Sequence, residues 1–297
     1  MKTDDRIFKQ ELSIKDTEFD IDSMAFYCLY ISVGHDNLRF CIIDSKSNRC
    51  VLLEDYRFFN QLSTDELIAS LNRIYDNDLF LKANFWQKIN IIPKGLPFTL
   101  IPREFFEESS PEKYLNLSAY KNESYLVVAA EQQSVDAINI FYAEKKLVNW
   151  FHKTYPTRVI EFTHQSAAFI EGVKRQNPKS KQSQTHIFID NNYFILLVVK
   201  EGQLEFCNVF PYHTSNDFIY FVLFVMDELR LDKESCPVKL YGNIDHNSEI
   251  FQLIRTYMVY VSVINEQPNW LKFGFAFEEI NNYQYFDLYG MHLCAQS

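Results

Sequence analysis

Glycine is scarce in this chain: its 297 residues include only 7 glycines, against 27 phenylalanines and 18 tyrosines. A backbone can approach a phosphate closely where there is no side chain and where the dihedral φ can be positive, and glycine provides both conditions. No Walker A sequence, Rossmann glycine fingerprint or Gly-x-Ser-x-Gly turn is present. These absences argue against a P-loop ATPase, a dinucleotide enzyme and a hydrolase of the acyl-transfer type.

Long apolar runs are absent as well. The longest one, Phe218–Met226, has nine residues, whereas a membrane-spanning helix needs about 20. The N-terminal stretch MKTDDRIFKQ is charged where a secretory signal would be apolar. We therefore expect a soluble, cytoplasmic protein without a membrane span.

Cysteine and histidine do not occur in metal-binding patterns. The six cysteines form no CxxC pair, and the seven histidines are scattered along the chain. Cysteines within apolar strand patterns are typical of reduced, buried thiols in a cytosolic protein. His35 and His246 each adjoin an aspartate, but in segments whose composition indicates turns. We expect no metal site and no catalytic residue.

The net charge is −10 and the isoelectric point about 5.2, which argues against an extended nucleic-acid surface. The densest basic run, between Lys174 and Lys181, lies in a polar segment without aromatic residues and is typical of a solvated linker. An acidic surface keeps a protein soluble or complements a basic protein partner.

Two similar segments organise the chain, Cys28–Phe58 and Thr185–Tyr212. Each predicts three short strands separated by turn-rich clusters, followed by a helix and another strand. Ser63 with Glu66 forms a capping box that predicts the start of the first of these helices. The second helix, Phe218–Leu231, is apolar nearly all round, and we expect it to be buried on most sides. The recurrence indicates two halves built alike, although a mixed α/β chain without an internal repeat can show similar spacings.

The segment 175–185 contains no large apolar residue and is rich in Ser, Gln and Lys. Such a composition is typical of a boundary between domains. We predict a first half over residues 1–176, with a small insertion near 118–156, and a second half over residues 185–297.

A β-β-β-α-β-α unit that occurs twice resembles the actin-like ATPase (RNase H-like) superfamily. Residues Tyr125–Gly172 are similar to the actin-like proteins of type IV pilus assembly and bacterial cell division: a strand ending in Ala129-Ala130 precedes a helix, a strand and a second helix with Ala167-Ala168 near its start. The whole chain also resembles a small uncharacterised bacterial family. The resemblance implies an α/β protein with the actin-like ATPase fold, in which two tandem RNase H-like halves surround a cleft.

The resemblance also indicates where a nucleotide would bind. The superfamily's Asp-x-Gly turn corresponds to Ser32-Val33-Gly34, which keeps the glycine and lacks the carboxylate. The second turn, Asp190-Asn191-Asn192, keeps the carboxylate and lacks the glycine, and the adenosine-contacting Gly-Gly corresponds to Gly242-Asn243. If nucleotide binding is retained, its residues are Ser32, Gly34, Asp190, Asn192, Gly242 and Asn243. Asp190 also has a simpler interpretation, since aspartate commonly stabilises a hairpin turn.

These half-kept motifs favour a non-catalytic, cytoplasmic actin-like scaffold that binds a protein partner and needs no cofactor. The alternative is a conformational switch that binds Mg-ATP and hydrolyses it weakly or not at all. Aromatic clusters at Tyr56–Phe59 and Tyr283–Tyr289 are candidates for exposed protein-recognition surfaces. A homodimer built through the aromatic tail, Phe273–Ser297, is a further alternative.

Overall fold

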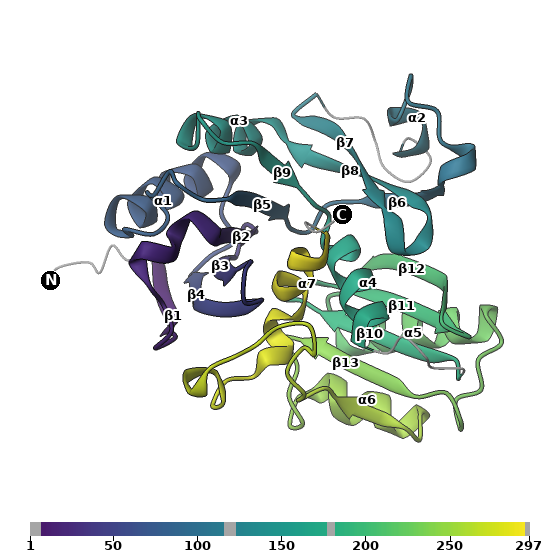
Figure 1. Ribbon diagram of the computed structural model, residues 1–297. Coiled ribbons are helices and arrows are strands. Elements are labelled where there is room, and N and C mark those ends of the chain that lie inside the picture. Colours follow the sequence, from purple (N-terminus) through teal and green to yellow (C-terminus); the bar gives the residue numbers. More distant parts are fainter. Residues whose placement is uncertain (1–6, 116–122, 177–181, 295–297) are drawn as a thin grey trace, which may run out of the picture.

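The computed structural model describes residues 7–115, 123–176 and 182–294. Two lobes, each built on a large sheet, lie side by side, and a small third sheet lies next to the second lobe (Figure 1). None of the helices in the described ranges is both long and apolar enough to cross a membrane.

The first lobe contains a six-stranded sheet in the order β1-β4-β3-β2-β5-β9. Neighbouring strands from β1 to β2 pair antiparallel, whereas β5 and β9 continue the sheet in parallel. The strands are β1 (Phe8–Lys15), β2 (Tyr27–Val33), β3 (Asn37–Asp44), β4 (Arg49–Phe58), β5 (Lys88–Pro93) and β9 (Ile160–Phe162). Alternate residues of β2 face different cores: Leu29 and Ile31 point toward the helices of their own lobe, and Cys28 and Tyr30 point toward the second lobe.

The second lobe repeats this arrangement with five strands in the order β12-β11-β10-β13-β14. The first three pair antiparallel, and β13 and β14 are parallel to β10. The strands are β10 (Gln184–Ile189), β11 (Tyr193–Lys200), β12 (Gln203–Pro211), β13 (Val238–Gly242) and β14 (Val261–Val263). The predicted fold class, two tandem β-β-β-α-β-α halves, is confirmed.

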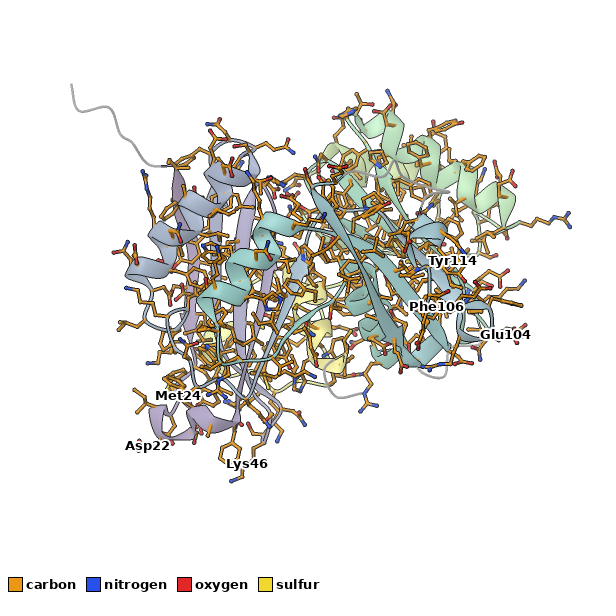
Figure 2. The ribbon with its side chains drawn as sticks, turned by 90° about the horizontal axis from the view of Figure 1, so that it is seen from above. Asp22, Met24, Lys46, Glu104, Phe106 and Tyr114 are labelled. Atoms are coloured by element: carbon orange, nitrogen blue, oxygen red, sulfur yellow. The ribbon has the colours of Figure 1, made fainter. Side chains whose placement is uncertain are left out.

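A three-stranded antiparallel sheet is inserted between β5 and β9, in the order β6-β8-β7. Its strands are β6 (Phe98–Pro102), β7 (Tyr125–Gln132) and β8 (Ala137–Glu144). The short helix α2 (Glu112–Leu115) packs on this sheet. The rings of Phe106 and Tyr114 lie 5.9 Å apart there. In Figure 2 they lie at the opposite end of the molecule from Met24. Residues 118–122 of the insertion predicted near 118–156 lie outside the described residues, and the domain boundaries stay a prediction.

Two pairs of helices cover the outer faces of the large sheets, and a third pair lies between the sheets (Figure 1). The outer helices are α1 (Thr64–Asn77) and α3 (Lys145–Thr154) on the first lobe and α5 (Ser215–Glu228) and α6 (Glu249–Tyr257) on the second. The predicted capping box of α1 is present: Ser63 Oγ accepts from the Glu66 amide, and the Glu66 carboxylate accepts from the Ser63 amide.

The inner helices α4 (Gln165–Gln176) and α7 (Phe286–Cys294) join the lobes into one core. They pack against each other closely, because a Cβ atom on Gly290 would lie only 2.2 Å from the carbonyl oxygen of Ala168. Phe169 and Phe286 are fully buried and meet edge to face. The lobes therefore share buried side chains below the cleft.

Two expectations about aromatic surfaces are wrong. The cluster Tyr283–Tyr289 is not an exposed recognition surface, because Tyr283, Tyr285, Phe286 and Tyr289 are all buried against the sheets. Conversely, α5 is not buried on most sides, since Tyr220 is 62% and Phe224 49% exposed. The physical reason is the same in both cases: α7 takes the position between the sheets, which leaves α5 a single sheet face to cover.

Candidate functional site: the cleft between the lobes

The cleft lies where parallel strands of both sheets end. Strands β2 and β5 of the first lobe and β10 and β13 of the second all point their carboxyl ends toward it. In open α/β sheets, ligands bind beyond the carboxyl ends of such strands. The turns that follow these four strands therefore form the candidate site.

Four of the six predicted residues, Gly34, Asp190, Asn192 and Asn243, lie in these turns. Gly242 is the last residue of β13, and Ser32 does not lie at a strand end. Ser32 lies within β2, is 1% exposed, and its hydroxyl has no hydrogen-bond partner among the described residues. Two turn amides are already used within their hairpins: the Gly34 amide donates to the Asn37 carbonyl at 2.9 Å, and the Asp190 amide to the Tyr193 carbonyl at 2.9 Å.

An ion pair between Lys94 and Asp190 joins the two lobes at the centre of the site. Lys94 Nζ lies 2.6 Å from Asp190 Oδ2, and the two side chains are only 3% and 1% exposed. Lys94 also donates to Asn37 Oδ1 at 3.1 Å, and Asp190 Oδ1 accepts from the Asn191 amide at 2.9 Å. Burial opposes the ionisation of Asp190, but the nearby charges of Lys94 and Arg39 outweigh it and lower its pKa.

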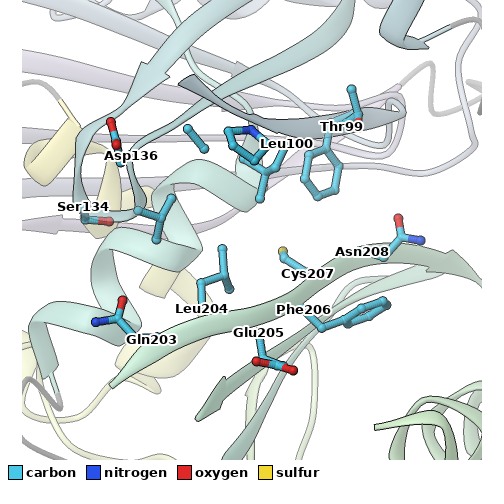
Figure 3. A pocket seen from close by; sticks show the side chains of 14 residues that line it. Thr99, Leu100, Ser134, Asp136, Gln203, Leu204, Glu205, Phe206, Cys207 and Asn208 are labelled. Carbon is cyan, nitrogen blue, oxygen red and sulfur yellow. The ribbon is translucent and has the colours of Figure 1, made fainter. Parts of the chain in front are cut away.

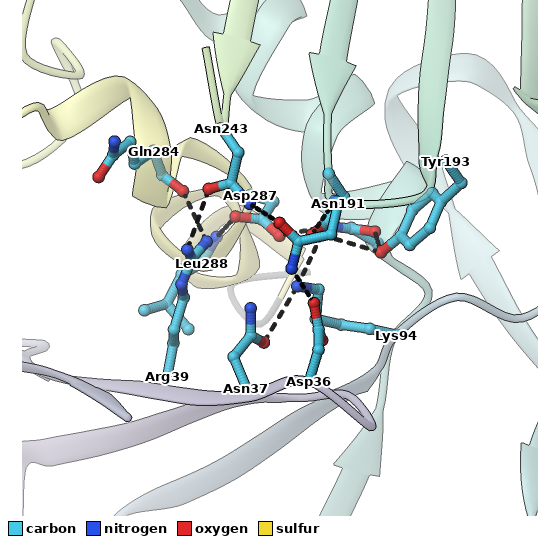
Figure 4. A network of polar contacts seen from close by, with 12 residues as sticks. Asp36, Asn37, Arg39, Lys94, Asn191, Tyr193, Asn243, Gln284, Asp287 and Leu288 are labelled. Atoms are coloured by element: carbon cyan, nitrogen blue, oxygen red, sulfur yellow. Dashed lines mark hydrogen bonds and ion pairs between the residues drawn. The ribbon is translucent and has the colours of Figure 1, made fainter. Parts of the chain in front are cut away.

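A second connection runs beside this ion pair (Figure 4). The side chain of Asn191 donates to Asp36 and accepts from Asn243 Nδ2 at 3.1 Å. Asn243 Oδ1 in turn accepts from Arg39 Nη2 at 3.2 Å. The β2–β3 turn and β3 of the first lobe are thus bonded to the turns after β10 and β13 of the second.

Arg39 is held in place by groups from both lobes. Its Nε donates to Asp55 Oδ2 at 2.9 Å, and its Nη1 to the carbonyl of Gln284 at 3.2 Å. The guanidinium lies 5.2 Å from the ring centre of Tyr285, whose hydroxyl donates to Asp55 at 3.2 Å. Arg39 therefore neutralises a buried carboxylate and links it to the segment before α7.

Behind the ion pair, a buried polar chain connects the cleft to the inner helices. Tyr193 OH donates to Gln165 Oε1 at 2.7 Å and lies 3.1 Å from Asp190 Oδ2. Gln165 Nε2 donates to Asp287 Oδ2 at 2.7 Å. Burial raises the pKa of Asp287, which is 2% exposed. Helices α4 and α7 thus contact the same network as the cleft turns.

The network divides the cleft into two cavities. One of about 800 Å³ is lined by residues including His35, Lys94 and Tyr193, and the other, of about 450 Å³, by residues including Asn243 and Tyr285. Asp36 and Asn191 line both cavities, so their hydrogen bond lies between them. Among the described residues, no three His, Cys, Asp or Glu side chains are arranged to hold a metal ion.

His35 anchors the rim of the larger cavity to the small sheet. Its Nε2 lies 2.6 Å from Glu144 Oε1 and its Nδ1 2.7 Å from the carbonyl of Leu62, while Thr64 Oγ1 donates to Glu144 Oε2 at 2.6 Å. The hydrogen bond to Glu144 raises the pKa of His35 despite burial. Burial opposes the ionisation of Glu144, but the bonds from His35 and Thr64 outweigh it and lower its pKa.

The His35→Gln variant should lose stability in a pH-dependent way, because glutamine keeps a donor and carries no charge. Because the pKa of His35 is raised in the folded state, its protonation stabilises the folded protein. This stabilisation is complete below the ordinary pKa of 6.5 and is lost as the pH rises through the folded-state pKa. We expect a loss of about 1–2 kcal/mol at pH 6 and a smaller loss at pH 9, measured by urea unfolding. The same exchange at the exposed His213 is the control. Equal losses at both pH values for His35→Gln would contradict the assignment.

Several cleft residues lie outside the predicted set, among them Asp36, Arg39 and Lys94. Lys94 carried a usable signal, since it directly follows the apolar strand β5 and precedes a glycine. Arg39 carried none, because its partner Asn243 is 204 residues away in the chain and comes from the other lobe. Only the approach of the lobes brings these two side chains together.

Two lobes with the same strand order and a cleft at their parallel strand ends define a protein of the actin-like ATPase fold, which confirms the resemblance. The chain belongs to the family described as "Protein of unknown function (DUF3822)", whose model matches residues 16–261.

Solved structures support the same fold. A protein of unknown function with an actin-like ATPase fold from Bacteroides thetaiotaomicron VPI-5482 is 21% identical, with a TM-score of 0.77, and the match covers 93% of this chain and 99% of that one. A chain of the PilM–PilN type IV pilus biogenesis complex is 11% identical with a TM-score of 0.63, covering 90% and 97%. A comparison with curated protein sequences found no match. At these identities the similarity establishes the fold alone.

Proposed function

We propose that this protein is a non-catalytic, cytoplasmic actin-like module that binds a protein partner, and that its cleft no longer takes up a nucleotide. The observation that carries the proposal is the buried ion pair between Lys94 and Asp190, at 2.6 Å, in the centre of the cleft. A nucleotide that lay along both cavities would have to break this pair or the neighbouring Asp36–Asn191 bond.

The residues present do not supply the groups that bind a magnesium triphosphate. Phosphates are bound by several converging backbone N–H donors, and the amides of Gly34 and Asp190 are bonded within their own hairpins. Magnesium-dependent phosphoryl transfer relies on carboxylates to hold the metal. The position that corresponds to the aspartate of the superfamily's Asp-x-Gly turn is occupied by the buried Ser32. Lys94, a cation that could contact phosphates, is paired with Asp190.

A protein partner is supported by one of the structural neighbours, since PilM was solved as a complex with PilN. The formal charge of −10 favours a partner with a basic surface. The common ancestry of the two halves by internal duplication also remains our inference, supported by their matching strand order.

Addition of 1 mM MgATP is expected to leave the melting temperature unchanged. A ligand with a Kd of 10 μM would stabilise the folded state by about 2.7 kcal/mol at that concentration, which corresponds to roughly 5 °C or more for a protein of this size. Differential scanning fluorimetry with MgATP, MgADP and magnesium alone measures the difference.

A rise in melting temperature with MgATP would overturn the proposal in favour of the ATP-binding switch, provided that it depends on the cleft. Asn243→Trp places a large ring in the smaller cavity and should abolish such a rise. Asn247→Trp, an exchange at an exposed residue that lines neither cavity, is the matched control.

A further inference from the structure

Both ring nitrogens of His35 face hydrogen-bond acceptors. Nδ1 lies 2.7 Å from the carbonyl oxygen of Leu62, and Nε2 lies 2.6 Å from Glu144 Oε1. Neither oxygen has a proton to donate while Glu144 is ionised, so both nitrogens must carry hydrogen if both contacts are to form. A neutral imidazole has one N–H group, whereas the imidazolium has two. The arrangement therefore fits the protonated ring and leaves the neutral ring one hydrogen short.

The contact that a neutral ring loses is the one with Glu144. His35 and Leu62 are also joined through the backbone, because the Leu62 amide donates to the His35 carbonyl at 2.9 Å. This second bond keeps the Leu62 carbonyl next to Nδ1, so the remaining hydrogen is best placed there. The Glu144 carboxylate can turn away from the ring and still accept from Thr64 Oγ1. In the neutral state Nε2 and Glu144 face each other as two acceptors, and the contact opens.

The charges around His35 favour the imidazolium. The other titratable groups that line the same cavity are Asp36, Lys94, Tyr125, Glu144 and Tyr193. The carboxylates of Glu144 and Asp36 stabilise the charged ring. The charge of Lys94 is compensated by Asp190, and burial raises the pKa of both tyrosines, which keeps them neutral. The protonated ring is therefore the form that its surroundings stabilise.

The contact with Glu144 attaches one end of the small sheet to the cleft. Glu144 is the last residue of β8, His35 lies in the β2–β3 turn, and both line the larger cavity. The opposite end of the sheet is bonded to α4, where Gln132 Nε2 donates to the carbonyl of Ala167 at 3.2 Å. Along β6 the sheet faces β12 across a groove of about 660 Å³ (Figure 3). His35 thus holds the end of the small sheet that borders the cleft.

We propose that His35 is a pH-sensitive latch: the protonated ring holds the Glu144 end of the small sheet against the β2–β3 turn, and loss of the proton releases Glu144 and opens the larger cavity at this rim. The movement is confined to the contact between the small sheet and this turn, because Glu144 stays bonded to Thr64 of α1. The latch does not depend on whether the cleft takes up a nucleotide, since neither His35 nor Glu144 belongs to the residues predicted to bind one.

The Glu144→Gln variant separates the latch from the rest of the fold. Glutamine has the shape of the carboxylate, and its amide can donate to the unprotonated Nε2 of a neutral His35 while its oxygen still accepts from Thr64. The latch should therefore stay closed in this variant when the ring loses its proton. Glu234→Gln, at an exposed residue that does not line the cavity, is the matched control and should behave as the wild type.

Hydrogen exchange at pH 6 and pH 9, corrected for the intrinsic effect of pH on exchange, measures the opening. In the wild type, protection of the amides in residues 142–146 should fall about ten-fold at pH 9 relative to amides of β10, as expected for one lost hydrogen bond to a charged group. In Glu144→Gln it should not change. The ¹⁵N chemical shifts of His35 should show both nitrogens protonated at pH 6. A neutral ring at pH 6, equal protection at both pH values in the wild type, or an undiminished fall in Glu144→Gln would overturn the latch.

Discussion

The Lys94→Met variant is expected to lose about 3–5 kcal/mol of stability, because it leaves Asp190 charged and unpaired in a site where the carboxylate is only 1% exposed. Methionine fills a similar volume, so the loss reports on the charge and not on packing. The pKa of Asp190 is lower in the folded state than its ordinary value of 3.8. Asp190 therefore contributes to the stability of the folded state above pH 3.8, and this contribution is lost as the pH falls through its folded-state pKa. The deficit should therefore be larger at pH 7 than at pH 3. Urea unfolding at both pH values measures it.

Two further variants establish whether the loss belongs to this ion pair. Lys94→Met combined with Asp190→Asn removes the buried charge and should recover at least half of the lost stability. Lys146→Met breaks an exposed pair with Asp65, whose side chains are 64% and 76% exposed, and should cost less than about 1 kcal/mol. A cost below about 1 kcal/mol for Lys94→Met itself would show that the lobes are not held by this contact.

The Gly242→Ala variant is expected to be destabilised by roughly 3–5 kcal/mol. Gly242 has a φ of +84°, and a Cβ atom there would lie 2.1 Å from the carbonyl oxygen of Ile189. The positive φ costs an alanine about 1–2 kcal/mol, and separating the backbones of β13 and β10 adds a packing penalty of about 1–3 kcal/mol. Thermal and urea unfolding measure the loss.

Gly95→Ala is the matched control for this exchange. Gly95 has a similar φ of +73°, but the nearest atom to its added Cβ, on the Tyr193 ring, is 3.6 Å away. It should therefore show the dihedral cost alone, about 1–2 kcal/mol. If both variants lose the same stability, the close approach of β13 to β10 is not what requires glycine at position 242.

This comparison affects how the cleft motif is interpreted. Gly242 matches the adenosine-contacting position of the superfamily, and its presence alone suggests a retained nucleotide site. The contact with Ile189 gives a second reason for glycine that involves no ligand. A residue that the fold requires is therefore weak evidence for nucleotide binding.

Much of the fold was predictable because its signals are local. Turn-rich clusters between apolar runs predicted the two meanders, and Ser63 with Glu66 predicted the start of α1. The apolar character of α5 was a poorer guide, since apolar helices differ in which neighbours cover them, and Tyr220 remains exposed. The aromatic residues before α7 misled in the opposite direction, because the helix lies between the sheets.

The sequence by itself determined the succession of strands and helices along each half, the capping box of α1 and the incomplete motifs at Ser32, Asn192 and Asn243. Only the tertiary structure decided what lies in the cleft, where Lys94 meets Asp190 and Arg39 meets Asn243. The physical reason is that strands and caps depend on neighbours within a few residues, whereas each of these contacts forms only when two separately folded sheets are brought together by the helices between them.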